Sequence, residues 1–202
     1  MIKYIIPTLA IGAAAGYLNS NWSSIISSFW VSNYLFNGSL MLLLFVMGLT
    51  FGMDEEAVTK MRRTGPKILV IPFAIVFGSI LGGVVSGLVL GINMVATTAV
   101  SAGYGWYTLA GPLLGQLFGA EWGALGFAAN FLRELLTIIT ISLVVRFDKY
   151  VPVAFGGATS MDTTLPVTVR YCGSEMLITA FSSGFTLSLI APITIIAIAA
   201  LG

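Results

Sequence analysis

Two apolar stretches of this chain are interrupted by glycine and polar residues where a membrane helix would be expected to continue. The interruptions are residues 103–112 (Gly-Tyr-Gly-Trp-Tyr-Thr-Leu-Ala-Gly-Pro) and 156–166 (Gly-Gly-Ala-Thr-Ser-Met-Asp-Thr-Thr-Leu-Pro). Lipid cannot satisfy the amides and carbonyls of irregular backbone, so such breaks occur only where they line a cavity or are buried in protein. A pair of broken segments in a small membrane protein therefore predicts a transport site.

The composition identifies an integral membrane protein without help from any motif. Of the 202 residues, 57% are hydrophobic and 8% are charged, against about 25% charged in a typical soluble domain. A net charge of +1 argues against a nucleic-acid partner, and the lack of histidine excludes a His-based catalytic triad. Cys172 is the only cysteine, so no intrachain disulfide or cysteine-based metal site is expected. We expect no enzyme activity and no cofactor.

Five apolar stretches approach the roughly 20 residues that a bilayer crossing needs. They are residues 4–18, 35–51, 68–90, 122–145 and 177–201. The first follows Lys3 as a signal peptide would, but its early Pro7 and its glycines and alanines suit a retained packing helix, which we expect. Residues 22–30 combine tryptophan with serine and predict an interfacial segment.

The basic residues predict the orientation, because cytoplasmic loops carry an excess of lysine and arginine. The loop between the second and third stretches should be cytoplasmic, since it carries Lys60, Arg62, Arg63 and Lys67. Eight of the nine basic residues lie inside if residues 96–119 enter and return from outside and residues 152–173 do so from the cytoplasm. The N-terminus is then inside and the C-terminus outside.

The apolar stretches and the distribution of basic residues together predict an all-α integral membrane protein with five spans and two re-entrant or broken segments of opposite orientation. Such an arrangement is the pattern of an inverted repeat, although no sequence identity between the two halves marks one. A broken helix that crosses the membrane fully at either place is the alternative.

Three polar residues lie in the middle of the stretch 122–145, and they are Asn130, Arg133 and Glu134. A charge at mid-membrane costs about 2.5–3.5 kcal/mol on insertion scales, so it normally faces a bundle interior or a wet cavity. Asn130 and Glu134 share a helix face, which we predict to bind substrate or ion. Arg133 points about 100° away, toward another charge or a lipid phosphate, in a structural or gating role. The alternative is an ion pair that only fixes helix packing.

Asp162 is the acidic candidate in the second interruption. Ser160 and Thr163 supply hydroxyls beside its carboxylate, and such oxygens suit a cation such as sodium or an ammonium group. The carboxylate could also carry a proton. The alternative is an N-cap for a half-helix that begins near Leu165, with Pro166 in its first turn.

Aromatic residues mark the first interruption. Tyr104, Trp106 and Tyr107 stand beside Gly103 and Gly105, which let the backbone bend or approach closely. Aromatic faces near a carboxylate can hold an alkylammonium by cation–π attraction, so we include the three aromatics in the predicted binding site. The alternative is an interfacial aromatic belt.

Two charged residues flank the second interruption, and they are Arg170 and Glu175. Their position predicts either a gate at its inner mouth or an ordinary solvated loop. No protein-ligated metal is expected beyond a sodium ion near Asp162.

The motifs, taken in order, resemble the lysine exporter family (LysO) of bacteria and archaea. The matching residues are 102–111, 130–134 and 159–166, and the resemblance runs from about residue 35 to the end. It implies ion-driven export of L-lysine, or a similar cationic amino acid, across the cytoplasmic membrane. It also implies that Glu134 and Asp162 serve the cationic solute or a coupled proton. Residues 35–202 would be the family-like core of a single transmembrane domain, preceded by a first helix and interfacial segment in residues 1–34.

One departure from the family concerns length, because its members are longer at the N-terminus. A homodimer or a second small membrane subunit would complete the fold. The expected mechanism is exchange of lysine for protons or sodium. Two alternatives stay open: a sodium/proton antiporter-like carrier, and a non-transporting membrane subunit of a larger carrier.

Overall fold

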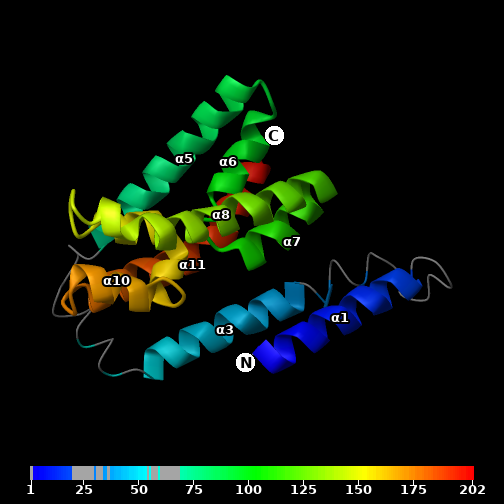
Figure 1. Ribbon diagram of the computed structural model, residues 1–202. Helices are drawn as coiled ribbons and strands as arrows, with labels where there is room; N and C mark the ends of the chain where they lie inside the picture. The colour runs from blue at the N-terminus through cyan, green and yellow to red at the C-terminus, as the bar shows by residue number, and fades with distance from the viewer. Residues whose placement is uncertain are drawn as a thin grey trace. The chain divides into compact units, whose positions relative to one another are not determined.

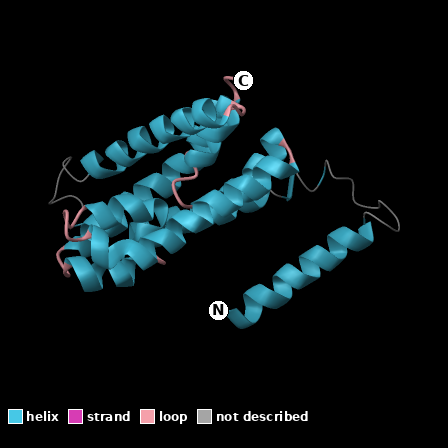
Figure 2. Ribbon diagram, turned by 45° about the horizontal axis from the view of Figure 1, so that its top comes forward, coloured by secondary structure: helices cyan, strands magenta, loops and turns pink. Residues whose placement is uncertain are grey.

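The computed structural model describes residues 2–19, 30, 34, 35, 37–53, 55, 59 and 69–202. The chain divides into two compact units, Met1–Thr50 and Phe51–Gly202, which are considered separately below. All regular structure among the described residues is helical, and no strand occurs there (Figures 1 and 2). The predicted all-α class is thus confirmed.

The N-terminal part contains two apolar helices, α1 (Ile2–Leu18) and α3 (Asn37–Met53). Each has 17 residues, which is the short limit for a membrane span. They coincide with the predicted stretches 4–18 and 35–51 to within a few residues. The predicted interfacial segment, apart from Trp30, lies outside the described residues, as do the predicted basic loop residues 60, 62, 63 and 67.

The second unit alternates long helices with pairs of short ones. Its elements are α5 (Val70–Leu90), α6 (Met94–Ser101), α7 (Tyr107–Phe118), α8 (Ala120–Val144), α9 (Val151–Gly156), the 3₁₀ helix η4 (Gly157–Met161), α10 (Leu165–Cys172) and α11 (Met176–Ala199). Of the described helices, α5, α8 and α11 are long and apolar enough to cross a membrane. They are the predicted stretches 68–90, 122–145 and 177–201, so the protein is a multi-pass membrane protein.

The end of α5 and the starts of α6 and α8 lie at one end of this unit, which is here named the Trp122 end. α5 and α8 run antiparallel, since Ser79 on α5 bonds Arg133 on α8, and Leu90 and Trp122 line one cavity farther along. The C-terminus of the chain lies beside Val95, so α11 also finishes there. Helices α6 and α7 therefore leave from this end and return to it.

The opposite end, here named the Cys172 end, is closed by a buried apolar cluster. The cluster comprises Val153, Cys172, Met176 and Ala180, with Ile71, Val145 and Leu165 packed against it. It joins the start of α5, the end of α8 and the start of α11 to α9 and α10. The second pair of short helices therefore leaves from this end and returns to it.

Small residues close the helical hairpins. A Cβ on Gly123 of α8 would lie 2.9 Å from the Gly115 Cα and from the Gly111 carbonyl oxygen of α7. Helices in membranes approach most closely through such residues, because their packing depends on van der Waals contact. At the start of α6, Asn93 Oδ1 accepts the Ala96 N–H at 3.0 Å, a side-chain N-cap that begins the helix immediately after the turn.

Candidate functional site

The first break lies between α6 and α7, where the backbone turns left-handed. Tyr104 has φ 50° and Gly105 has φ 98°, and Tyr104 is the one non-glycine residue with positive φ in the part of the chain that the structure describes. This conformation is strained for a bulky side chain, and such strain concentrates at functional sites. It directs the Tyr104 carbonyl to the second break, where the carbonyl accepts the Ala158 N–H at 2.8 Å.

The two breaks are in direct contact. A Cβ on Gly105 would lie 3.0 Å from the Gly156 carbonyl oxygen, and a Cβ on Gly157, whose φ is 61°, would clash with the Tyr104 carbonyl. Glycine is needed at these positions because two backbones approach without room for a side chain. The sequence predicted both breaks separately, but it did not predict that they touch.

Asn130 fixes the first break to α8. Its Oδ1 accepts the Gly105 N–H at 2.7 Å, and its Nδ2 donates to the carbonyls of Val100 at 3.0 Å and Gly126 at 2.8 Å. A Cβ on Gly103 would lie 2.6 Å from the same Nδ2. These bonds use both donor hydrogens of the amide and its oxygen. Asn130 thus holds the backbone of the site, and its predicted role in binding solute stays a prediction.

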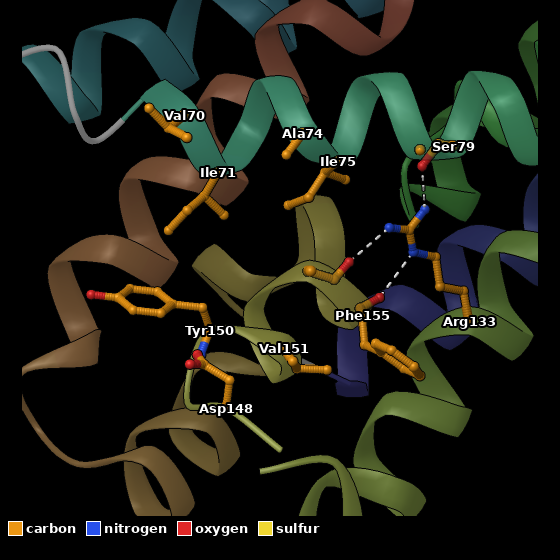
Figure 3. A pocket seen from close by; sticks show the side chains of 12 residues that line it. Val70, Ile71, Ala74, Ile75, Ser79, Arg133, Asp148, Tyr150, Val151 and Phe155 are labelled. Carbon is orange, nitrogen blue, oxygen red and sulfur yellow. Dashed lines mark hydrogen bonds between the residues drawn. The ribbon is translucent and has the colours of Figure 1, made fainter. Parts of the chain in front are cut away.

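Arg133 holds the second break to α8 and α5. Its Nε donates to the Phe155 carbonyl at 2.9 Å, its Nη2 to the Ala154 carbonyl at 2.9 Å, and its Nη1 to Ser79 Oγ at 3.1 Å (Figure 3). Both carbonyls belong to the last turn of α9, the negative end of that helix dipole, which a guanidinium stabilises. In the structural role expected for it, Arg133 bonds backbone carbonyls and a hydroxyl.

Glu134 is buried on the inner face of α8. The buried residues of that helix are Gly126, Asn130, Glu134, Thr137 and Ile141, so Asn130 and Glu134 share a face as predicted. The Glu134 side chain is 7% exposed, and its Oε2 has no hydrogen-bond partner among the described residues. Its carboxylate lies close enough to Asp162 to interact electrostatically. A buried acidic group of this kind in a membrane protein is a functional candidate.

Asp162 lies at an exposed position just before α10. The helix begins at Leu165, as predicted, but its N-cap is Thr164 and no side chain caps it. The Asp162 carboxylate accepts the Thr163 N–H instead, so the alternative interpretation of Asp162 as a side-chain N-cap is wrong. The N–H groups in the first turn of α10 therefore have no side-chain cap. Pro166 does occupy that turn, where its missing N–H costs nothing.

Ser160 has a structural environment in the second break. Its side chain is 0% exposed, and its Oγ lies 2.6 Å from the Gly157 carbonyl oxygen and 2.9 Å from that of Ala180 on α11. The hydroxyl therefore fastens η4 to α11. Thr163, the other predicted hydroxyl ligand, is exposed beside Asp162.

The three predicted aromatic residues point to different surroundings. Tyr107 lies edge-on to Phe127 and Phe131 of α8, with ring centroids 5.3 and 5.5 Å apart. It also interacts electrostatically with Glu134 and Asp162. By contrast, the Tyr104 side chain is fully buried near Thr194 of α11, and Trp106 is the half-buried N-cap of α7. Of the three, Tyr107 is the residue whose interaction with both carboxylates the structure shows.

Ends of three short helices lie around the adjacent charges of α8. The C-terminus of α9 also lies against the N-cap of α10, because a Cβ on Gly156 would be 2.7 Å from Thr164 Oγ1. Tyr107 is the first residue of α7, and Asp162 comes shortly before α10, so both helix N-termini lie on the side of Glu134. Neither N-terminus has a side-chain cap. The C-terminus of α9 lies instead on the side of Arg133. Each charge of the adjacent pair thereby faces helix ends of opposite sign.

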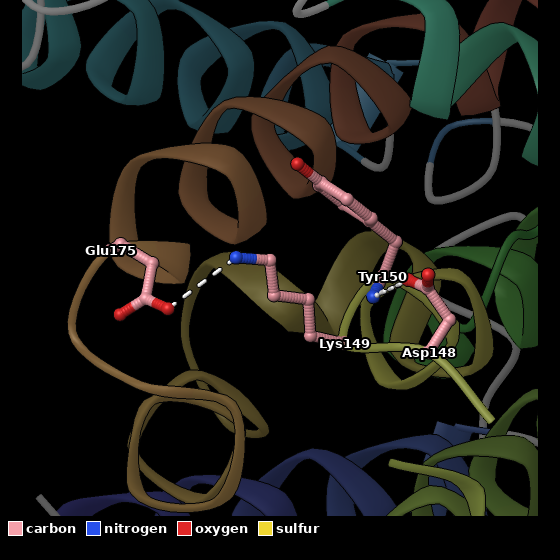
Figure 4. Close-up of polar contacts among 4 residues, drawn as sticks. All are labelled: Asp148, Lys149, Tyr150 and Glu175. Carbon is pink, nitrogen blue, oxygen red and sulfur yellow. Dashed lines mark hydrogen bonds and ion pairs between the residues drawn. The ribbon is translucent and has the colours of Figure 1, made fainter. Parts of the chain in front are cut away.

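Arg170 and Glu175, which flank the second break, are both exposed, and the gating role of these two residues stays a prediction. Glu175 bonds Lys149 at 3.5 Å, with both side chains largely exposed (Figure 4). Arg170 is exposed in the last turn of α10. Hydrogen bonding of Glu175 to its own backbone, followed by the Lys149 bond and charge, lowers the pKa of Glu175. This contact joins the loop after α8 to the start of α11.

Two cavities lie along α5, the first facing α9 and the second facing α8. One, of about 760 Å³, is open toward Val70, Asp148 and Tyr150 at the Cys172 end (Figure 3). The other, of about 430 Å³, extends toward the Trp122 end. Ser79 and Arg133 line both, so their hydrogen bond stands between the two cavities. Glu134 and Asp162 line neither of them.

Sequence reasoning missed Ser79 and Thr168, and it noted Thr164 only as a hydroxyl beside Asp162. Ser79 lies in the apolar helix α5, and its polar side chain next to Gly78 was the available sequence signal. Thr164 and Thr168 are fully buried, and their hydroxyls have no hydrogen-bond partner among the described residues. Their spacing of four residues in a short polar helix was the available signal.

The chain matches the family model of the lysine exporter LysO over residues 6–199. It is 34% identical over 160 residues to the lysine exporter LysO of Escherichia coli (strain K12), which covers 78% of this chain and 52% of that protein. A second curated relative, from Haemophilus influenzae, is 31% identical over 98 residues, or 48% of this chain and 50% of the relative. The chain spans about half the length of these curated relatives. No solved structure matches it.

Proposed function

Since the chain belongs to the lysine exporter LysO family, a family of transporters and not of enzymes, we propose that it exports L-lysine across the cytoplasmic membrane. Export is coupled to the entry of protons or sodium. The observation that carries this proposal is the burial of Glu134, beside Asp162, at the N-termini of two half-helices.

The charges of this site complement those of lysine. Lysine carries two ammonium groups and one carboxylate. Glu134 and Asp162 bind the ammonium groups, and Tyr107 adds an aromatic face beside them. The uncapped N-termini of α7 and α10 offer backbone N–H groups and positive dipole ends to the carboxylate. Binding of a proton or sodium ion at the carboxylates then releases lysine.

The proposed topology has five spans and two re-entrant segments that enter from opposite faces. Its support is that α6 and α7 return to the Trp122 end while α9 and α10 return to the Cys172 end. Residues 91–132, which surround the Trp122 end, contain no lysine or arginine, whereas Arg146, Lys149 and Arg170 belong to the Cys172 end. The excess of basic residues on cytoplasmic sides makes the Cys172 end cytoplasmic and the C-terminus external.

The proposal includes a partner, because the chain spans about half of its curated relatives. Either a second copy or another small membrane subunit completes the transporter. The mass of the complex purified in mild detergent distinguishes these, and a purely monomeric protein that transports lysine would contradict both.

The direct test is efflux of lysine from cells that lack other exporters and express either wild-type protein, Glu134→Gln or Asp162→Asn. We expect each change to reduce efflux by at least about a hundredfold, since it removes a charge partner of the solute. Glu121→Gln, at the Trp122 end and away from both carboxylates, is the matched control. Normal efflux in both site variants would refute the site. Sodium-driven proton flux in proteoliposomes without lysine would favour the antiporter instead.

A further inference from the structure

A groove runs along α5 from one end of the second unit to the other. It consists of the two cavities that meet at Ser79 and Arg133. Val70 lines it at the Cys172 end, and Leu90 lines it at the Trp122 end. These residues begin and end α5, whose 21 residues extend over about 30 Å. The groove, here named the α5 groove, therefore has the length of a membrane span.

Small residues of α5 form one wall of this groove. Gly78, Gly82 and Ser86 follow one another at intervals of four, so they share a helix face, and all three are exposed. A Cβ on either glycine would meet nothing within 4 Å. The other small pair of α5, Gly83 and Gly87, is packed closely against the backbone of α6. Membrane helices pack through such residues, so the open face of α5 is suited to one further helix.

The polar side chains along the second cavity have little left to offer a polar solute. Carbonyls of their own helices accept hydrogen bonds from Ser86, Thr97 and Ser101, at 2.7, 3.0 and 2.8 Å. Asn130 uses its amide on three backbone groups. The walls of the first cavity are mainly aliphatic and aromatic. Packing surface with satisfied hydroxyls fits an apolar helix better than a hydrated solute.

Arg133 places a partly compensated positive charge midway along the α5 groove. Three of its five N–H groups bond neutral partners, which are Ser79 and the carbonyls of Ala154 and Phe155. The end of the α9 dipole contributes about half a unit of negative charge. No carboxylate in the part of the chain that the structure describes forms an ion pair with Arg133. Charges at membrane depth are normally paired, so the occupant of the groove is expected to bring a carboxylate.

A second copy of this chain has no free carboxylate at that depth. Glu134 is the one acidic residue within the five apolar stretches, and it is 7% exposed inside its own chain. Neither α1 nor α3 contains an acidic residue. The chain spans about half the length of its curated relatives, and a partner would supply the remaining helices.

We propose that the α5 groove holds a membrane helix from outside these 202 residues. The helix presents small or apolar residues to Gly78 and Gly82, and an Asp or Glu near its middle pairs with Arg133. This inference rests on the partner in the proposed function and deepens it. It assigns the interface and the chemistry of the partner, and it excludes a second copy as the occupant of the groove.

The test is photo-cross-linking from the groove in native membranes. Phe155, which lines the first cavity and is 44% exposed, is replaced by p-azidophenylalanine. The matched control places the same probe at Phe77, which is 71% exposed on α5 and lines neither cavity. After irradiation the full-length protein is purified and cross-linked peptides are sequenced. We expect the probe at Phe155, but not at Phe77, to reach an apolar segment absent from this sequence that has Asp or Glu near its middle.

The charge pair is then tested in the identified helix. Replacing its acid by the amide should lower the amount of complex that co-purifies by about tenfold. The amide combined with Arg133→Met should lower it no further than Arg133→Met alone, because the two residues form one interaction. Arg146→Met is the control, since Arg146 is exposed outside the groove. The cross-linking result stands by itself if Arg133→Met does not fold.

Cross-links from Phe155 that end in α1, in α3, in a second copy or only in lipid would overturn the inference. Additive effects of the amide and Arg133→Met would also overturn it. Neither measurement involves lysine, so its outcome is separate from that of the proposed function. An outside helix in the groove without lysine efflux would refute lysine export alone. Lysine efflux by a protein whose groove reaches no outside helix would refute the inference alone.

Discussion

At the scale of single residues, Asn130 and Arg133 show how side chains replace the hydrogen bonds that a broken helix lacks. Asn130 bonds two backbone groups in and around the first break, besides one carbonyl of its own helix, and Arg133 bonds two carbonyls at the end of α9. In lipid, each of those groups would be costly without a partner. The polar residues of α8 therefore make the irregular backbone possible, besides contributing charge to the site.

Removing the Asn130 side chain should destabilise the first break. Asn130→Ala leaves the Gly105 N–H and the Val100 carbonyl without their partner, and we expect the free energy of unfolding to fall by about 3 kcal/mol. The measurement is thermal unfolding of the purified protein in detergent. Ser86→Ala is the control, because Ser86 bonds only a carbonyl of its own exposed helix turn. Equal melting of Asn130→Ala and wild type would contradict the assigned role.

The Glu175–Lys149 pair should give a small, acid-sensitive contribution to stability. The pKa of Glu175 is lowered in the folded protein, first by its own backbone and then by Lys149. Its contribution is therefore complete above the ordinary glutamate pKa and is lost as pH falls through the lowered one. We expect Glu175→Gln to melt slightly below wild type at neutral pH and equally at pH values below both pKa values. A difference that grows on acidification would contradict this assignment.

At the scale of elements, the positions of the long helices were predictable, and the contacts of the short ones were not. α5, α8 and α11 begin and end within a few residues of the predicted stretches, because apolar length alone defines a span. The start of α10 at Leu165 was also expected. The alternative of an N-cap at Asp162 is wrong, since a local pattern cannot tell which N–H a short carboxylate will meet. The contact of Tyr104 with Ala158, and the partners of Arg133, depend on how distant segments pack.

The direct contact between the two breaks should be lost if Gly157 is replaced by a residue with a side chain. Gly157→Ala places a Cβ against the Tyr104 carbonyl at a φ of 61°, which costs of the order of 1–3 kcal/mol in backbone strain before the clash is counted. We expect loss of both thermal stability and lysine efflux. Gly115→Ala on α7 is the matched control, because its Cβ would make an ordinary contact at 3.6 Å with Gly123. A fully active Gly157→Ala protein would show that the breaks do not touch.

At the scale of the whole molecule, the two ends of the second unit make the proposed topology testable. Asn93 and Glu121 both belong to the Trp122 end, whereas Ser174 belongs to the Cys172 end. A first segment that crossed the membrane fully would separate Asn93 from Glu121. The re-entrant arrangement keeps them on one side.

Single cysteines at these positions should report their sides of the membrane. The variants Asn93→Cys, Glu121→Cys and Ser174→Cys are made with Cys172→Ser, which removes the one natural thiol. We expect an impermeant maleimide to label the first two in intact cells and the third only after permeabilisation, because the Cys172 end is proposed to be cytoplasmic. Labelling of Asn93→Cys and Glu121→Cys from opposite sides would establish a full crossing.

The adjacency of Arg133 and Glu134 also restricts how this protein can change shape. The two side chains diverge by about 100° on α8, one toward the carbonyl end of α9 and the other toward the N-termini of α7 and α10. Rolling α8 about its axis by a single residue would bring one of the two charges to a helix end of its own sign and would turn the other away from its present surroundings. We therefore expect α8 not to rotate about its own axis during transport. α8 and the two breaks in contact with it should move together as one rigid body, and access to the site should alternate at the boundaries of that body.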